Sequence, residues 1–137
     1  MDYTTDFVLE EISDESQRWQ IEECIQKGDI IVIDTSNDLA PISELYREIS
    51  PLSFADCSVL YHAIKRNGTL LSGDKALRIQ ARKREVKVHG VIFVLDQLLL
   101  EHKIEKSDAL TVLDMLKKLN PRLPKDIIMK RMKIWKL

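Results

Sequence analysis

The sequence has few of the residues that mark specialised protein classes. Its 137 residues include four glycines, four prolines and two cysteines, and aromatic residues make up 6%. The cysteines, Cys24 and Cys57, have no metal-type spacing, and a cytosolic chain would keep them reduced. His62, His89 and His102 likewise form no ligand motif. The sequence therefore gives no support to a disulfide scaffold or to a cysteine–histidine metal site.

Long apolar runs are missing as well. No run approaches the roughly 20 residues of a membrane span. The acidic start MDYTTDFVLEE lacks the positive charge with which a signal peptide begins. The remaining composition, 45% hydrophobic and 31% charged, is ordinary for a soluble protein. We therefore expect a cytoplasmic protein without membrane association that folds as one domain over residues 1–137.

The net charge of −1 conceals an uneven distribution. Residues 1–48 contain thirteen acids and three bases, a balance of −10, so residues 49–137 carry +9. Basic residues gather in the tail 122–137 and in the segment 75–87, which includes Lys75, Arg78 and Arg82. Such clusters can hold a phosphate backbone electrostatically, or they can be solvated faces of helices.

Helical and strand patterns alternate along the chain. Thr5 or Asp6 can cap a short first helix, and Ser13–Asp14 starts a second helix that stops at Gly28. The first clear strand is Ile30–Ile33. Pro41 fits an early position of the next helix.

The second half continues this alternation. Ser53 is expected to cap a helix with Asp56 in a capping box, and Gly68 is expected to close it. Further elements are expected as follows: a short strand at 69–72, a helix after Asp74, a strand over 86–95 through Gly90, a helix over 94–102, a helix from Ser107 that Asn120–Pro121 ends, and a last helix after Pro124. This order predicts an α/β fold with a parallel sheet.

Three carboxylates and one hydroxyl are candidates for chemistry. Asp74 follows a strand directly, where parallel sheets place functional groups, although it can also be a simple helix N-cap. Asp56 has an equally plain role in a capping box, and Glu11 can be one solvated charge among many. If the three met, their repulsion would call for a hard cation such as Mg²⁺ or Mn²⁺, which could activate water against a phosphodiester. Ser72 could orient that water or a carboxylate, or simply end its strand.

Several motifs together resemble the PIN domain family. The segment LSFADCSVLYHAIKRNGTLLSGDKALRIQARKREVKVHGVIFVLDQLL resembles the C-terminal half of that domain, with its L-S-x-A-D helix start and its strand ending in T/S-x-D. TTDFVLEEI resembles an earlier motif in which an acidic residue lies three positions after a valine. The later segment HKIEKSDALTVLDMLKKLNPRLPKDII resembles a C-terminal helical extension, here about residues 103–137. The resemblance runs from about Thr4 to Ile128 and depends on the order and spacing of short motifs.

The resemblance implies a fold and an activity. The fold would be a PIN-like three-layer α/β/α arrangement with a short parallel sheet. The activity would be that of an Mg²⁺- or Mn²⁺-dependent endoribonuclease, which in many family members is the toxin of a toxin–antitoxin pair. Carried over by motif, Glu11, Asp56 and Asp74 would hold the metal, and Ser72 would be the neighbouring hydroxyl residue. Lys75, Arg78 and Arg82, on the basic helix, would steer the RNA.

The family's first acidic motif, a central strand ending in D-T-S or D-T-N, does not stand ahead of Glu11, so we expect an N-terminally truncated fold. Asp34 begins a D-T-S, but it follows the Glu11 helix, and we expect it in a turn or N-cap apart from the other acids. Without that strand the sheet would have an open groove with unpaired backbone groups. The start could be misplaced, a second copy could fill the groove in a homodimer, or the chain could have lost catalysis.

Two functions follow from the resemblance. The first is a metal-dependent endoribonuclease, impaired to some degree by the absent motif. The second is a non-catalytic PIN-like module that binds RNA or a protein partner such as an antitoxin, inserted near the acidic pocket. A generic α/β domain with a small-molecule site has less support, because no glycine-rich phosphate loop is present.

Overall fold

The computed structural model describes residues 1–49 and 51–137 and contains both helices and short strands. The chain divides into two compact units, an N-terminal unit (Met1–Val88) and a C-terminal unit (His89–Leu137). We describe each unit by itself. The mixture of helices and short strands confirms the expected α/β class.

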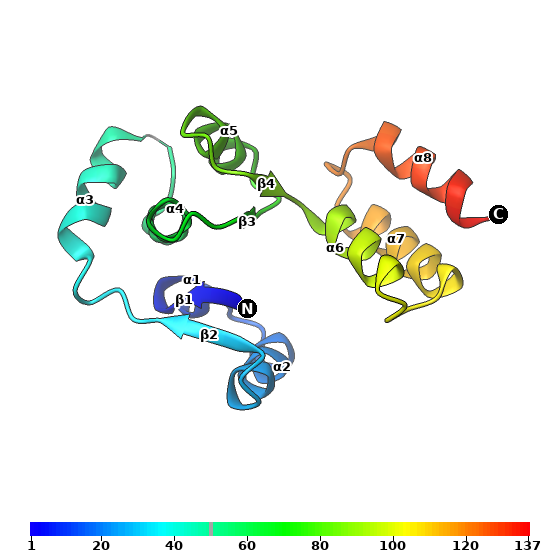
Figure 1. Ribbon diagram of the computed structural model, residues 1–137, viewed down its shortest axis with the longest axis horizontal. Coiled ribbons are helices and arrows are strands. Elements are labelled where there is room, and N and C mark those ends of the chain that lie inside the picture. Colours follow the sequence, from blue (N-terminus) through cyan, green and yellow to red (C-terminus); the bar gives the residue numbers. More distant parts are fainter. Residues whose placement is uncertain (50) are drawn as a thin grey trace. The chain divides into compact units, whose positions relative to one another are not determined.

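The N-terminal unit begins with a pair of parallel strands. Strand β1 (Asp2–Thr5) pairs with β2 (Ile30–Ile33) in a register that places Asp2 opposite Ile30. Helices α1 (Asp6–Glu10) and α2 (Glu15–Gln26) connect the two strands, and α2 packs beside β2 (Figure 1). Strand β2 confirms the strand expected at Ile30–Ile33, but the preceding strand β1 was not expected from the sequence. The segment Asp2–Thr5 contains strand-forming Tyr and Thr but no apolar alternation, so only its pairing with β2 identifies it.

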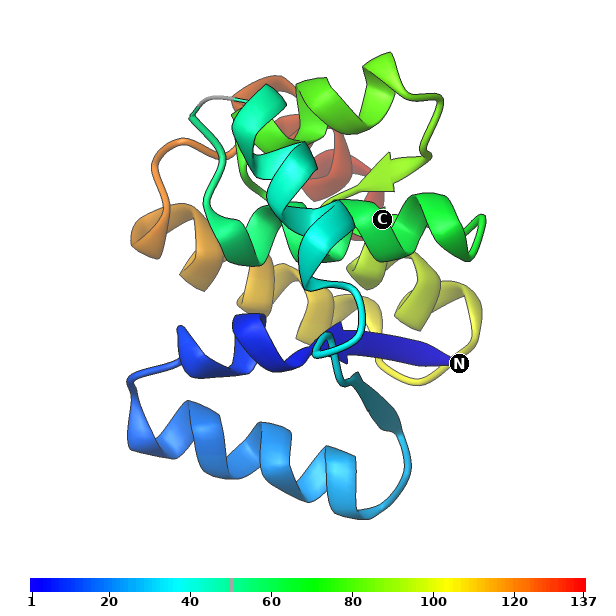
Figure 2. The same cartoon turned by 90° about the vertical axis from the view of Figure 1, so that its left-hand side faces the viewer.

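A second strand pair lies further along the chain. Helices α3 (Leu39–Glu48) and α4 (Phe54–Lys65) pack against each other and lead to β3 (Leu70–Leu71). Helix α5 (Lys75–Lys83) then connects β3 to its sheet neighbour β4 (Val88–His89). The Leu70 N–H donates to the carbonyl of Lys87 at 2.8 Å. Helix α4 is central to this unit, since it packs beside β1 as well as against α3, α5 and β3 (Figures 1 and 2).

The buried core of the N-terminal unit surrounds α4. Leu60 and Cys57 of this helix are fully buried, and Ile42 of α3 and Leu70 of β3 pack into the same cluster. Burying side chains of this size stabilises the fold by about 1.5–3 kcal/mol each. Most residues of this cluster follow α3 in the sequence, and those of α4, β3 and α5 pack against one another. Helix α4 therefore holds β3 and α5 in place.

Local capping sets the ends of α4. Ser53 and Asp56 form the expected capping box, in which the Asp56 N–H donates to Ser53 Oγ at 3.0 Å. The helix ends differently from the expectation, because Asn67 and not Gly68 takes the left-handed conformation, with φ of 51°. Asparagine tolerates this conformation better than most residues, which explains how it replaces glycine there.

The C-terminal unit is helical. It contains α6 (Val91–Leu100), α7 (Lys106–Leu119) and α8 (Lys125–Trp135). Their buried residues form one cluster: Ile92, Leu95, Ala109, Leu113, Ile128 and Trp135. None of the helices described between residues 1 and 137 is long and apolar enough to cross a membrane.

Two sequence expectations in this unit were wrong. The strand expected through Gly90 stops at His89, and Gly90 is the N-cap residue of α6. An apolar run such as Val91–Leu95 fits a buried helix as well as a buried strand, and its packing against α7 decides the outcome. Helix α7 starts one residue before Ser107, because Glu105 and Asp108 form a capping box that the sequence reading missed.

Candidate functional site

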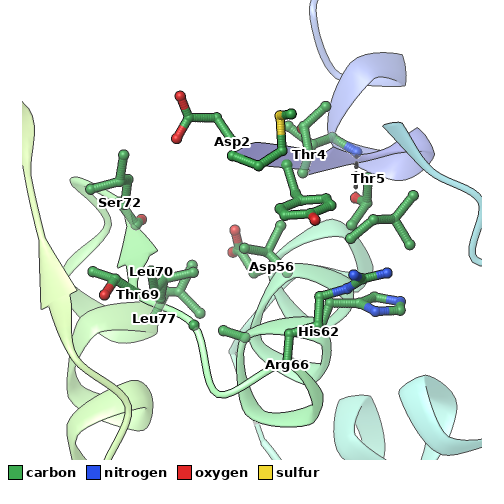
Figure 3. Close-up of a pocket in the computed structure, with 18 of the residues that line it drawn as sticks. Asp2, Thr4, Thr5, Asp56, His62, Arg66, Thr69, Leu70, Ser72 and Leu77 are labelled. Carbon is green, nitrogen blue, oxygen red and sulfur yellow. Dashed lines mark hydrogen bonds between the residues drawn. The ribbon is translucent and has the colours of Figure 1, made fainter. Parts of the chain in front are cut away.

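A cavity of about 680 Å³ lies in the N-terminal unit between strands β1 and β3. Helix α4 borders it from below, and Figure 3 shows Asp56, His62 and Arg66 on this helix, with the two strands on either side. A buried hydrogen bond of 2.8 Å between the hydroxyls of Thr5 and Ser58 fixes β1 on α4.

Three of the four site residues expected from the sequence border this cavity. Glu11 follows α1, Asp56 lies in the first turn of α4, and Ser72 follows β3 directly. Glu11 is exposed, and Asp56 and Ser72 are half-buried. The fold thus brings together residues that are up to 61 positions apart, from Glu11 to Ser72, on the wall of one cavity.

Asp74 is linked to the cavity through Ser72 and does not border it. The Asp74 N–H donates to Ser72 Oγ at 3.1 Å, and Asp74 Oδ2 accepts from the N–H of Leu77 at 2.8 Å. The second contact makes Asp74 the N-cap of α5, the plainer of its two expected roles. Asp56 also caps its helix, since its Oδ2 accepts from the Ser53 N–H at 3.4 Å.

The chemistry of these groups fits a divalent cation with oxygen ligands. Mg²⁺ is commonly held by one or two carboxylates, with water and phosphate oxygens completing its coordination. Glu11 and Asp56 could supply two such carboxylates, because both border the same cavity. Among residues 1–49 and 51–137, no group of three histidine, cysteine or acidic side chains is arranged to hold a metal ion.

Several cavity residues were not expected from the sequence. Asp2 borders the cavity from β1, and Arg66 and His62 border it from α4. The Arg66 guanidinium lies 4.7 Å from the ring centroid of Tyr3, which connects the far end of α4 to the start of β1. Asp2 could have been found only by recognising Asp2–Thr5 as a strand, because its place depends on pairing with β2.

His62 is a buried histidine with unusual surroundings. Its Nε2 lies 3.4 Å from Asp38 Oδ2, but in the described part of the chain neither ring nitrogen has a hydrogen-bond partner of good geometry. Burial lowers the pKa of His62, and this effect exceeds the opposing attraction of Asp38. His62 is therefore held mainly in its neutral form at neutral pH.

Asp34 lies outside the residues that border the cavity. Its Oδ1 accepts from the Ser36 N–H at 2.9 Å, as in a turn, and this hydrogen bond lowers the pKa of the exposed Asp34 carboxyl. The neighbouring Thr35 is fully buried and donates to Asp6 Oδ1 at 2.8 Å. The Asp-Thr-Ser segment thus connects the end of β2 to the start of α1, and Asp34 has the turn role expected for it.

The basic segment after the cavity forms helix α5. Lys75 and Arg82 are exposed, whereas Arg78 is half-buried. The Arg78 guanidinium donates to the Ser72 carbonyl at 3.5 Å, a long contact that places this cation beside the cavity wall. The positive charge of α5 therefore begins three residues after Ser72, where a phosphate chain could be held electrostatically.

Comparison with known proteins gives one positive result. A family model described as a PIN domain matches residues 3–136, nearly the whole chain. No curated protein and no solved structure matches the sequence. Since the family model spans both units and the fold is α/β, the chain belongs to the PIN domain family.

Proposed function

We propose that this PIN-domain protein is a metal-dependent endoribonuclease that acts at the cavity between β1 and β3. The observation that supports the proposal most directly is that Glu11, Asp56 and Ser72 border one cavity, with the basic helix α5 starting three residues after Ser72. An acidic wall beside a basic helix can accommodate a cation and the phosphate chain that the cation activates.

In this proposal each group has a distinct task. Glu11 and Asp56 hold Mg²⁺ or Mn²⁺, and Asp74 reaches the same region through its contact with Ser72. A cation bound there would supply Lewis acidity toward water and toward the developing phosphate charge. Lys75, Arg78 and Arg82 bind the RNA backbone, and the contact between Arg78 and the Ser72 carbonyl fixes one of these cations beside the acidic wall.

Cleavage of a labelled single-stranded RNA with and without Mn²⁺ tests the proposal. The chain should cut only with metal, and Asp56→Asn should reduce the rate by about 10²- to 10³-fold, as expected for losing several kcal/mol of charge stabilisation. Asp34→Asn is the matched control, because Asp34 is an exposed aspartate outside the cavity lining. Equal cutting by the chain and the Asp56→Asn variant would contradict the proposal.

A second candidate is a PIN-like module that binds RNA or a protein without cutting it. Asp56 and Asp74 both cap helices, and the described residues contain no three-ligand metal group, so each acid also has a structural role. Under this alternative, RNA binding persists without metal and depends on α5, while cleavage stays at background. Binding and cleavage measured on the same RNA therefore distinguish the two candidates.

Partners of two further kinds belong to the proposal. By analogy with toxin members of the family, an antitoxin protein would cover the acidic cavity and block RNA. A homodimer would bring a second copy of the chain to the open groove. Sedimentation of the protein alone would detect the homodimer. Sedimentation of the protein mixed with proteins encoded beside it would detect an antitoxin partner.

A further inference from the structure

An aromatic pair lies where strand β4 passes into helix α6 (Figure 1). The imidazole of His89, the last residue of β4, and the phenyl ring of Phe93, in the first turn of α6, have centroids 3.9 Å apart and an interplanar angle of 9°. The other aromatic pairs of the described residues are tilted or meet edge to face, as aromatic pairs usually do. His89 and Phe93 are therefore the one pair in that part of the chain with parallel, stacked rings.

The stacked pair lies outside both buried cores. Among the described residues, neither ring belongs to the core cluster of the N-terminal unit or to that of the C-terminal unit. Both side chains are half-buried, whereas their neighbours Val88 and Ile92 pack into these two cores. Core packing therefore does not account for the stack.

The imidazole of His89 is open to a ligand. In the part of the chain that the structure describes, the buried ring nitrogens without a hydrogen-bond partner are those of His62. The ring nitrogens of His89 have no hydrogen-bond partner among these residues either, so they face solvent. Histidine and phenylalanine are both side chains on which the bases of single-stranded RNA stack. The chemistry of the pair therefore suits a flat, aromatic ligand such as a nucleobase.

The charges near the pair favour a ligand that carries phosphate. Lys87 lies two residues before His89, and the basic helix α5 precedes it in the chain. Strand β4 is the sheet neighbour of β3, which ends next to Ser72. The one acid on α6, Asp96, is paired with Arg131. The pair thus adjoins the strands that flank the proposed RNA-binding cations, and its own helix has no free carboxylate to repel phosphate.

We propose that the His89–Phe93 pair is a stacking platform for a nucleobase of single-stranded RNA. The base extends the stack from two rings to three, while the cations of α5 bind phosphates. Because every base has a flat π-face, the platform supplies affinity without reading a particular sequence. The inference rests on the proposed function in taking RNA as the ligand, but it assigns the base contact to residues that have no part in the metal site.

RNA binding in the absence of metal tests the inference. One probe is a labelled single-stranded RNA of about ten nucleotides, within the site sizes of proteins that bind single strands. The matched probe is an abasic oligomer of the same length, which keeps the phosphates and lacks the bases. In excess EDTA, Phe93→Leu should weaken binding of the RNA by about 5- to 100-fold, the range for one stacked base. The same variant should leave binding of the abasic oligomer unchanged.

Two further variants separate stacking from folding. Phe93→Tyr keeps a planar ring and should bind the RNA as tightly as the natural chain does. His89→Gln removes the other ring and should weaken binding of the RNA but not of the abasic oligomer. Urea unfolding of each variant measures its stability, so a loss of base-dependent affinity in a folded variant reports stacking alone.

Several results would overturn the inference. Phe93→Leu could bind the RNA as tightly as the natural chain, or it could lose affinity equally for the RNA and the abasic oligomer. The natural chain could bind both probes equally, in which case phosphate contacts alone hold RNA and the proposed function stands without the platform. If the natural chain binds neither probe, the proposed function and the platform are both wrong.

Discussion

The two units of this protein treat their charged and polar groups differently. In the C-terminal unit, the carboxylate of Asp96 accepts three hydrogen bonds of 2.8–3.1 Å from Arg131, which ties α6 to α8. In the N-terminal unit, His62 is buried without a hydrogen-bond partner of good geometry among the described residues, and Asp2, Glu11 and Asp56 border a cavity. The Asp96 carboxylate is occupied by Arg131, whereas carboxylates that border a cavity are open to a ligand, so the proposed site lies in the N-terminal unit.

The largest effect on stability should come from a substitution that leaves a cavity in either core. Leu60 and Leu113 are both fully buried, one in each unit, so Leu60→Ala and Leu113→Ala form a matched pair. Each should lower the free energy of unfolding by about 2–5 kcal/mol. Hydrogen exchange should locate the loss in residues 1–88 for the first variant and in 89–137 for the second. Equal loss across both units in either variant would mean that the cores are not independent.

The two basic clusters provide the next comparison. Replacing Lys75, Arg78 and Arg82 of α5 with glutamine should lower the slope of log affinity for single-stranded RNA against log salt by about 2, since each phosphate contact contributes about 0.7. Replacing the same number of cations near the chain's end, Lys130, Lys133 and Lys136, should leave the slope unchanged. Equal reductions would assign RNA binding to both units.

The ion pairs of the two units should also differ in their contribution to the free energy of unfolding. Arg131→Ala removes a bidentate pair and should cost about 1 kcal/mol of unfolding free energy, near the upper end for partly exposed pairs. Lys65→Ala in the N-terminal unit removes a single contact of 3.4 Å to Asp38 and should cost less than about 0.5 kcal/mol. Urea unfolding of both variants measures the difference, and a larger cost for Lys65→Ala would reverse the comparison.

The smallest effect expected is a pH dependence that arises from His62. Because burial lowers its pKa in the folded state, the unfolded chain takes up the proton first as pH falls below about 6.5. The contribution of neutral His62 to the free energy of unfolding is therefore complete above that pH and declines below it. Unfolding free energies measured at about pH 7.5 and about pH 5.5 should differ more for the natural chain than for His62→Gln. An identical difference in both proteins would exclude His62 as the cause.

Local signals in the sequence predicted the helix starts well. Asp14, Ser53 and Asp74 each accept a hydrogen bond from a backbone N–H two or three residues into the helix, and this chemistry is readable from neighbouring residues alone. The capping box of Asp56 followed from the same rule. These residues needed no information from distant parts of the chain.

Strands and the cavity were harder to predict, because both depend on pairing across the chain. Strand β1 has a polar sequence and becomes a strand by pairing with Ile30–Ile33, and the run after Gly90 becomes helical by packing on α7. The resemblance to PIN domains selected Glu11, Asp56 and Ser72, which border one cavity, but it could not place Asp74 outside the lining. Side-chain geometry of that kind is decided by tertiary packing.

The central proposal is that the cavity between β1 and β3 binds the divalent metal ion. Paramagnetic broadening of backbone amide signals by Mn²⁺ tests it most directly, because it locates the ion without requiring activity. We predict that signals of Glu11, Asp56 and Ser72 broaden first as Mn²⁺ is added, and that Asp56→Asn weakens this effect. Broadening centred on the exposed turn at Asp34, or none at the cavity residues, would contradict the claim.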